Sequence, residues 1–247
     1  MVNMQIPLDR SHINSNTRPL IFIGSNIAMA KYLDVCDDHG IQVHGIIDQD
    51  YFGNTAELHG LPVIGSEEEF ENPERLAYYR ANFNFFCATN WMPIQDPVYV
   101  RNRQKRDRQL ALIEQLELDV ISLQHRLADV SKRAIIGRGV FVDSFVCVEC
   151  NCEIHDWAAL WSHAIIGHDT VVGRNCVLQR RCNISSHATF EPDVYFGLEV
   201  KQFKQNVIFG RGTFVHEGVC IKRGTVANEI VSFAGQNQRR VYDLLDQ

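Results

Sequence analysis

Residues 134–236 divide into blocks of six that read AIIGRG VFVDSF VCVECN CEIHDW AALWSH AIIGHD TVVGRN CVLQRR CNISSH ATFEPD VYFGLE, then VKQFKQN, then VIFGRG TFVHEG VCIKRG TVANEI VSFAGQ. The first position of the six-residue blocks is alanine, valine, cysteine or threonine, and the third is never polar. Residues two apart point to one face of a strand. A short fixed period is typical of coils that cover one another's apolar faces. The sequence therefore predicts a parallel β-helix with one short strand and one turn per block.

The turns of this β-helix are expected to fall after the third position. Five blocks carry glycine at position four, where we expect a tight corner with positive φ: Gly137, Gly167, Gly173, Gly197 and Gly210. The seven-residue block at residues 200–206 is expected to be a loop that leaves the β-helix, with Lys201 and Lys204 either solvated or in contact with a phosphate. An antiparallel barrel is the alternative fold, but strand alternation alone does not produce a strict six-residue period.

A β-α-β unit is expected near the start of the chain. The apolar run LIFI predicts a buried strand ending at Gly24, residues 27–38 predict a helix, and IQVHGIID predicts a second strand ending at Asp48. A glycine at the first turn is typical of nucleotide-binding folds. However, Asn26 and Met29 occupy the later glycine positions of G-x-G-x-x-G, which argues against a redox dinucleotide.

Strands and helices continue to alternate after Asp48, which predicts a small parallel sheet with helices on its faces. Ser66, with Glu69 three residues later, is a capping-type helix start. The remaining elements are expected at residues 58–65 (turn and strand), 83–89 (strand), 102–116 (amphipathic helix) and 119–125 (strand). Residues 1–18 are expected to be a polar tail.

Composition limits the classes of partner. The chain has 247 residues, of which 45% are hydrophobic, and its net charge is −6. We therefore expect an ordinary core and no nucleic-acid partner. The longest apolar runs are too short for a membrane span, and the first residues lack the apolar region of a signal peptide. We expect a cytoplasmic protein.

The eight cysteines are expected to be reduced thiols. Cys152, Cys176 and Cys182 occupy first positions, where a small buried residue is required. Cys147, Cys150 and Cys152 form a C-x-x-C-x-C run that is compatible with zinc, but their block positions differ and a fourth ligand is not evident nearby. We therefore expect no metal.

The blocks resemble the hexapeptide repeat of the left-handed β-helix acyltransferases. Together with the preceding β-α-β unit and the segment GLPVIG, they resemble the sialic-acid O-acetyltransferase and UDP-amino-sugar N-acetyltransferase group. The resemblance implies an α/β, Rossmann-like sugar-binding domain at residues 19–126 and a left-handed parallel β-helix at 127–247. It also implies a homotrimer, acetyl-CoA as acyl donor, and a nucleotide-sugar held near Gly24 and Asp48.

Residues 159–176, ALWSHAIIGHDTVVGRNC, resemble the catalytic segment of that family. On this match His168 is the general base that takes the acceptor's proton, and Asp169 orients its imidazole. The alternative is that His168 is a solvated turn residue. A second alternative pairs it with His163, as in the zinc-binding γ-class carbonic anhydrases, but a third histidine ligand is not identifiable.

Two departures concern the coenzyme A site. Val177 stands where many members carry a second histidine, and the usual closing motif G-N-P-A-[KR] is represented by GQNQRR. The resemblance implies coenzyme A contacts at Gly197, Gly235 and Arg239, with Arg240 also near the phosphates. The expected function is acetyl transfer to an amine or hydroxyl of a sugar, linked to a nucleotide, for surface-glycan synthesis. A non-catalytic β-helix trimer that acts as a scaffold or sugar-binding module is the alternative.

Overall fold

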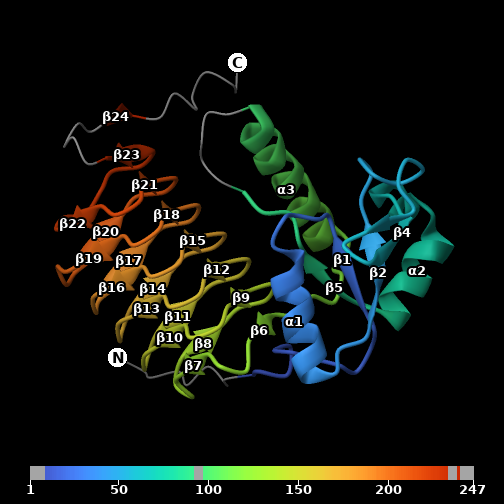
Figure 1. The fold of residues 1–247 in the computed structure, drawn as a ribbon, viewed down its shortest axis with the longest axis horizontal. Helices are drawn as coiled ribbons and strands as arrows, with labels where there is room; N and C mark the ends of the chain where they lie inside the picture. Colours follow the sequence, from blue (N-terminus) through green and yellow to red (C-terminus); the bar gives the residue numbers. More distant parts are fainter. Residues whose placement is uncertain (1–8, 92–96, 233–237, 240–247) are drawn as a thin grey trace. The chain divides into compact units, whose positions relative to one another are not determined.

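The computed structural model describes residues 9–91, 97–232 and 238–239. The chain forms two compact units: Asn14–Arg126, and Met1–Ile13 together with Leu127–Gln247 (Figure 1). In the part of the chain that is described, no helix is long and apolar enough to cross a membrane.

The unit Asn14–Arg126 is built on one sheet with the strand order β3-β4-β2-β1-β5. β1 pairs in parallel with both β2 and β5, β2 pairs in parallel with β4, and β3 is antiparallel to β4. Strands β1 and β5 are fully buried, as their apolar sequences predict. The elements are β1 (Leu20–Ile23), α1 (Met29–His39), β2 (Val43–Ile47), β3 (Glu57–Leu58), β4 (Leu61–Gly65), the 3₁₀ helix η1 (Glu67–Glu71), α2 (Pro73–Asn82), β5 (Asn84–Cys87), α3 (Pro97–Gln115) and β6 (Leu123–Gln124).

Two elements of this unit differ from expectation. Ser66 precedes only the short 3₁₀ helix η1 and its side chain makes no capping bond. The α-helix α2 begins later, where the Asn72 side chain accepts from two amides of the first turn and Pro73 follows. That combination is the stronger helix start. The strand expected at residues 119–125 is reduced to an isolated bridge and β6.

The second unit is a parallel β-helix (Figure 1). Strands pair in parallel with strands three blocks away, as Cys147 does with Ile165 and Ile165 with Asn183, so that one coil contains three blocks. The resulting stacks are β7-β10-β13-β16-β19-β22, then β8-β11-β14-β17-β20, and β9-β12-β15-β18-β21-β23-β24. The strands are β7 (Asp129–Val130), β8 (Ile135–Ile136), β9 (Phe141–Val142), β10 (Cys147–Val148), β11 (Glu153–Ile154), β12 (Ala159–Leu160), β13 (Ile165–Ile166), β14 (Val171–Val172), β15 (Val177–Leu178), β16 (Asn183–Ile184), β17 (Ala188–Phe190), β18 (Tyr195–Phe196), β19 (Lys201–Gln202), β20 (Val207–Phe209), β21 (Phe214–Val215), β22 (Cys220–Ile221), β23 (Glu229–Val231) and β24 (Gln238–Arg239).

The first and third block positions form the interior of the coils, which confirms the predicted period up to residue 221. Cys152, Cys176 and Cys182 are buried there and unpaired. Burial raises the pKa of Cys152 to about 11 and that of Cys182 to about 12, so both remain thiols at neutral pH. In the last coil the pairing shifts by two residues: Ala227 is exposed and Thr225 bridges Phe209 in its place, and Val231 pairs with Val215.

The corners of the coils correct the prediction made for glycine. The left-handed backbone falls at position six, not position four. Gly173 has no positive φ, but a Cβ on it would lie 2.4 Å from the carbonyl oxygen of Phe190 in the next coil, and a Cβ on Gly167 would lie 2.7 Å from the amide nitrogen of Ser186. Close approach of the neighbouring coil therefore requires glycine at these positions. The residues with left-handed backbone at position six are Gly139, Phe145, Asn151, Trp157, His163, Asp169, Asn175, Arg181, His187, Asp193, Glu199, Gly212 and Gly218.

The seven-residue block at residues 200–206 is not a loop that leaves the β-helix. It contributes β19, which pairs in parallel with β16 and β22. Gln202 takes the interior position and is 1% exposed. Its amide oxygen accepts from the amide of Ser185 at 2.9 Å and its nitrogen donates to the carbonyl of Lys204, so the buried side chain is satisfied. The extra residue is absorbed in the corner that follows.

The described part of the expected polar tail is held by the β-helix. The Arg10 guanidinium donates to the carbonyl oxygens of Ser131 at 2.6 Å and Ala134 at 2.7 Å. The His12 ring lies 3.0 Å from the carbonyl of Gly137, and Ile13 packs against the interior of the coils. These contacts show that residues 9–13 are part of the β-helix unit.

Candidate active site

His168 and Asp169 form a dyad at the corner between β13 and β14. Asp169 has left-handed backbone, with φ of 57°. The Nδ1 atom of His168 lies 2.6 Å from Oδ2 of Asp169. Both side chains are partly exposed, at 42% and 38%. The sequence match thus named two residues that the fold brings into direct contact.

The hydrogen bonds of Asp169 indicate which nitrogen of His168 donates to it. The pKa of Asp169 is lowered by the bond from His168 and then by the Asn151 amide, which donates to Oδ1 at 3.1 Å. An ionised carboxylate only accepts hydrogen bonds. Nδ1 of His168 is therefore the donor, and its Nε2 atom carries the lone pair that could accept a proton.

The backbone around the dyad is fixed by the coils on either side. The amide of His168 donates to the Glu149 carboxylate at 2.8 Å, and the amide of Asp169 donates to the carbonyl of Cys150 at 3.1 Å. The carbonyl of His168 accepts from the amide of His187 in the next coil at 3.0 Å. The dyad is therefore presented by a rigid scaffold, as a catalytic group requires.

His187 is a third residue at this corner, and the sequence analysis did not single it out. Its ring meets the His168 ring edge to face, with centroids 5.1 Å apart and an interplanar angle of 86°. One nitrogen or oxygen from each of His168, Asp169 and His187 lies within 4.8 Å of the others, so the three could also hold a metal ion. Because one coil contains three six-residue blocks, the sequence could have shown that His187 occupies the same position as Asp169 in the next coil.

His163, the alternative partner of His168, lies at a different corner. It falls between β12 and β13, and its ring contacts that of Phe145 with centroids 4.9 Å apart. Among the described residues, the groups able to hold a metal do not include His163. The His-x₄-His pair is therefore not assembled within one chain.

Gly24 and Asp48 lie together at the carboxyl ends of β1 and β2, where the amide of Gly24 donates to the carbonyl of Ile47 at 2.8 Å. Such an edge is where open α/β sheets bind ligands. A Cβ on Gly24 would lie 1.9 Å from Oγ1 of Thr89 and 2.9 Å from Oε1 of Gln109. The glycine is therefore required by these side chains.

Asp48 is completely buried and paired with a lysine that sequence reasoning missed. Lys105 of α3 donates to Oδ1 of Asp48 at 2.5 Å and to Asp50 at 2.7 Å. Burial raises the pKa of the Asp48 carboxyl, while Lys105 opposes that shift. Oδ2 of Asp48 is buried without a partner among the described residues. Lys105 lies far from Asp48 in the sequence, so no local pattern marked the pair.

A chain of hydrogen bonds and a small cavity adjoin this pair. Thr89 donates to Gln109 at 2.6 Å, and the Gln109 amide donates to the Glu67 carboxylate at 2.6 Å. Glu67 in turn accepts from the amide of Gln49 at 2.7 Å. The cavity has a volume of about 190 Å³ and is lined by Gln49, Glu67, Lys105, Arg108, Gln109 and Leu112. The cavity is therefore lined by both hydrogen-bond acceptors and cations.

Comparison by sequence finds no matching family model and no matching curated protein. Comparison by structure finds PerB from Caulobacter crescentus, crystallised with CoA and GDP-perosamine, at 20% identity and TM-score 0.72, over 90% of this chain and 98% of PerB. WeeI from Acinetobacter baumannii AYE matches at 19% identity and TM-score 0.71, over 90% of this chain and all (100%) of WeeI. This chain has the PerB fold.

A third match extends the comparison. The acetyltransferase domain of PglB from Neisseria gonorrhoeae FA1090, in complex with acetyl coenzyme A, matches at 20% identity and TM-score 0.53, over 90% of this chain and 99% of that domain. The expected likeness to sugar acyltransferases with hexapeptide repeats is confirmed at the level of the fold. Because the chains align over almost their whole length, the likeness includes both units.

The residues expected to contact coenzyme A are only partly covered by the described structure. A Cβ on Gly197 would lie 2.8 Å from the amide nitrogen of Glu217, so close packing between coils already explains that glycine. Gly235 and Arg240 lie outside the described residues, and only the backbone of Arg239 is described, antiparallel to β23. Val177 is 2% exposed on β15.

Proposed function

We propose that this protein transfers an acetyl group from acetyl-CoA to the amine of a nucleotide-linked sugar, with His168 as general base. The His168–Asp169 dyad carries the proposal, because the Nδ1 bond to Asp169 leaves the other ring nitrogen, Nε2, for the proton of the acceptor on a fixed corner. Support also comes from the PerB fold, since PerB was crystallised with CoA and GDP-perosamine and a histidine-to-alanine variant of that N-acetyltransferase was crystallised with the same ligands.

The reaction needs one base and no covalent enzyme intermediate. The acceptor nitrogen attacks the thioester carbonyl carbon, and its proton passes to Nε2 of His168 as the C–N bond forms. Asp169 accepts the Nδ1–H bond and stabilises the imidazolium. When the C–S bond breaks, the thiolate takes the proton from His168 and leaves as coenzyme A thiol. Backbone amides at the corners would meet the developing oxyanion.

The unit Asn14–Arg126 is proposed to hold the nucleotide-sugar as a Rossmann-like domain. Gly24 and Asp48 would lie beside the ligand, and Arg108, which lines the adjoining cavity, would supply positive charge for its phosphates. The buried Oδ2 of Asp48, which has no partner among the described residues, supports this assignment because it could accept a hydrogen bond from a hydroxyl of the ligand.

The proposal also includes three expectations from the sequence analysis. The coils are left-handed, three chains form a homotrimer, and coenzyme A contacts Gly197, Gly235 and Arg239. The free cysteines support a cytoplasmic location for a protein of surface-glycan synthesis. An amine is preferred to a hydroxyl as acceptor because the protein of this fold from Caulobacter crescentus is a GDP-perosamine N-acetyltransferase.

Two measurements test the proposal. Calorimetric titration with acetyl-CoA should show saturable binding at one site per chain, and the His168→Ala variant should bind equally well. In a turnover assay with GDP- and UDP-linked amino sugars, His168→Ala should lose about a hundredfold or more in kcat, since a general base contributes 10²–10⁴-fold. His155→Ala removes an exposed histidine at another corner and is the matched control.

The opposite results would support the scaffold alternative. Absence of binding up to millimolar acetyl-CoA would contradict the assignment as an acetyltransferase. Full turnover by His168→Ala would contradict the assignment of His168 as the general base.

A further inference from the structure

The relation between His187 and the dyad is set by the coil repeat. The strands before the two corners pair in register, Ile165 with Asn183 and Ile166 with Ile184. After the corners, β14 and β17 pair as well, with Val171 opposite Thr189. The amide of His187 donates to the carbonyl of His168 at 3.0 Å. Backbone bonds on both sides of the corner therefore fix the His187 Cα above the dyad.

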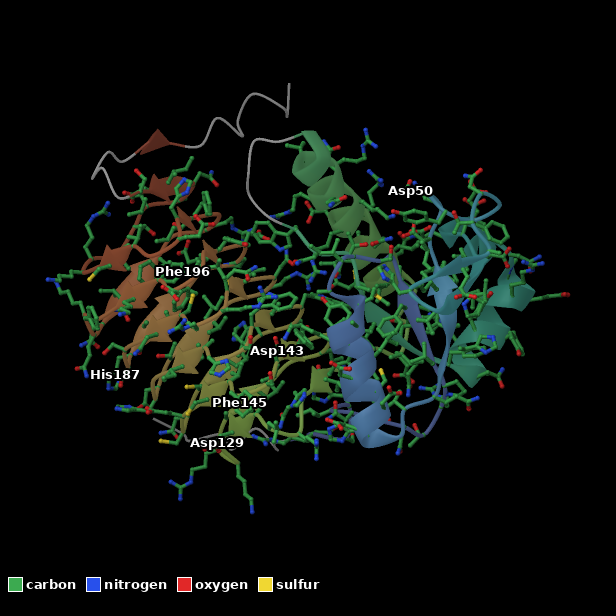
Figure 2. The ribbon with its side chains drawn as sticks, viewed as in Figure 1. Asp50, Asp129, Asp143, Phe145, His187 and Phe196 are labelled. Atoms are coloured by element: carbon green, nitrogen blue, oxygen red, sulfur yellow. The ribbon has the colours of Figure 1, made fainter. Side chains whose placement is uncertain are left out.

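The His187 side chain is exposed and projects from the outer edge of the β-helix, whereas Phe196 lies inside the coils (Figure 2). Among the described residues, no side chain forms a hydrogen bond with the His187 ring. Its contact is with the His168 ring, edge to face at 5.1 Å. Aromatic pairs at this separation and angle attract one another. The imidazole therefore covers one side of His168 while leaving the Nδ1 bond to Asp169 intact.

We propose that His187 is a positioning residue that holds the His168 imidazole against Asp169. A histidine ring on an exposed corner rotates about χ2, and only one orientation directs Nδ1 to Asp169 and Nε2 to solvent. The His187 ring restricts that rotation from one side, and the Glu149 and Asn151 contacts fix the backbone and the carboxylate from the other.

This inference rests on the proposed function, because it assigns His187 a part in the same dyad. It differs from the metal-binding alternative, in which His168, Asp169 and His187 would be ligands together. Here Asp169 Oδ2 remains bonded to Nδ1, as the 2.6 Å distance indicates. The two alternatives predict opposite responses to a chelator.

Two substitutions distinguish the effect of the His187 ring from an effect of the backbone at this corner. His187→Asn removes the ring but keeps a residue that tolerates left-handed backbone, as Asn151 and Asn175 do at the same block position. His187→Phe keeps an aromatic ring without nitrogen, and Phe145 shows that position six accommodates phenylalanine. His163→Asn is the matched control, since it makes the same change at another corner.

In the turnover assay, His187→Asn should lower kcat about threefold to tenfold with KM changed less than twofold, and His187→Phe should recover most of that loss. In a His168→Ala background, His187→Asn should have no further effect, because it acts through the missing ring. Loss of activity in both His187 variants, an equal loss in the His168→Ala background, or loss on chelation with recovery on adding Zn²⁺ would each overturn the proposal.

A spectroscopic measurement keeps this inference separate from the proposed function. Nitrogen-15 NMR of the histidine rings in the full chain, at a pH where they are neutral, reports the tautomer of each ring. His168 should show a single form with Nδ1 protonated in the wild type and in His187→Phe, and a mixture in His187→Asn. That result would support the inference even if no acceptor sugar were turned over. An unchanged His168 spectrum in His187→Asn would overturn it.

Discussion

Lys105→Met is expected to destabilise the unit Asn14–Arg126 because it leaves a carboxylate buried without its counter-charge. Lys105 is 6% exposed and bonds to Asp48, which is 0% exposed. In the variant, Oδ1 of Asp48 would still accept a hydrogen bond from the backbone amide of Asp50, at 3.0 Å. Oδ2 would remain without a partner among the described residues. Methionine matches the length of the lysine stem, so the packing of α3 is retained.

The size of the effect is bounded by the proton that Asp48 can take up. Removing one member of a buried ion pair costs about 3–5 kcal/mol. Protonating a carboxyl with an ordinary pKa of about 3.9 at pH 7 costs about 4 kcal/mol, since each pH unit is worth about 1.4 kcal/mol. We therefore expect the free energy of unfolding to fall by about 3–4 kcal/mol at pH 7.

The pH dependence has a definite sign. The folded-state pKa of Asp48 is already raised by burial. Without Lys105 it rises further above the unfolded value, so stability is greatest below the unfolded pKa and is lost as pH rises towards the folded pKa. The cost of protonation at pH 5 is about 1.5 kcal/mol. The loss caused by Lys105→Met should therefore shrink by about half between pH 7 and pH 5.

Urea unfolding at the two pH values, monitored by hydrogen exchange of the β1 and β2 amides, would measure this unit by itself. Arg101→Met changes an exposed cation on the same helix and should alter stability by less than about 0.5 kcal/mol. Lys105→Met combined with Asp48→Asn should lose the pH dependence. A loss below 1 kcal/mol at pH 7, or one that is the same size at pH 5, would contradict the reasoning.

Two further predictions concern the β-helix. Asp169→Asn replaces an acceptor with a side chain that can donate, so the His168 tautomer is no longer fixed; kcat should fall about a hundredfold while acetyl-CoA binding, measured by calorimetry, is unchanged. Unchanged turnover would show that Asp169 is a corner residue only. Gly173→Ala should lower the free energy of unfolding by about 1–3 kcal/mol, because its Cβ would meet the Phe190 carbonyl at 2.4 Å. Gly40→Asn, where a Cβ meets no atom within 4 Å, is the control in thermal unfolding.

The chain's local patterns predicted the β-helix well, for a physical reason. The apolar first and third positions face one direction from each strand, so the period alone specifies an interior and a coil of repeated blocks. The dyad was also accessible, because His168 and Asp169 are neighbours in the chain. Gly24 and Asp48 follow apolar runs, and the carboxyl ends of parallel strands meet at one edge of a sheet.

The corners and the irregular blocks were not predicted correctly. Position six tolerates left-handed backbone with residues as different as Trp157 and Asp193, so composition did not mark it. The seven-residue block at 200–206 breaks the period and suggested a loop, yet Gln202 lies in the interior, where bonds with the backbone of Ser185 and Lys204 satisfy its amide. The six-residue period placed Ala227 in the interior, but in the last coil Thr225 bridges Phe209 instead.

The sequence by itself determined the repeated fold and the chemical character of the dyad, because both depend on residues close together in the chain. Only the tertiary structure decided which side chains complete the sites. His187 reaches His168 through the stacking of coils, and Lys105 reaches Asp48 because α3 returns to the edge of the sheet. Such contacts join residues far apart in sequence, and no local spacing encodes the distance between them once the chain has folded.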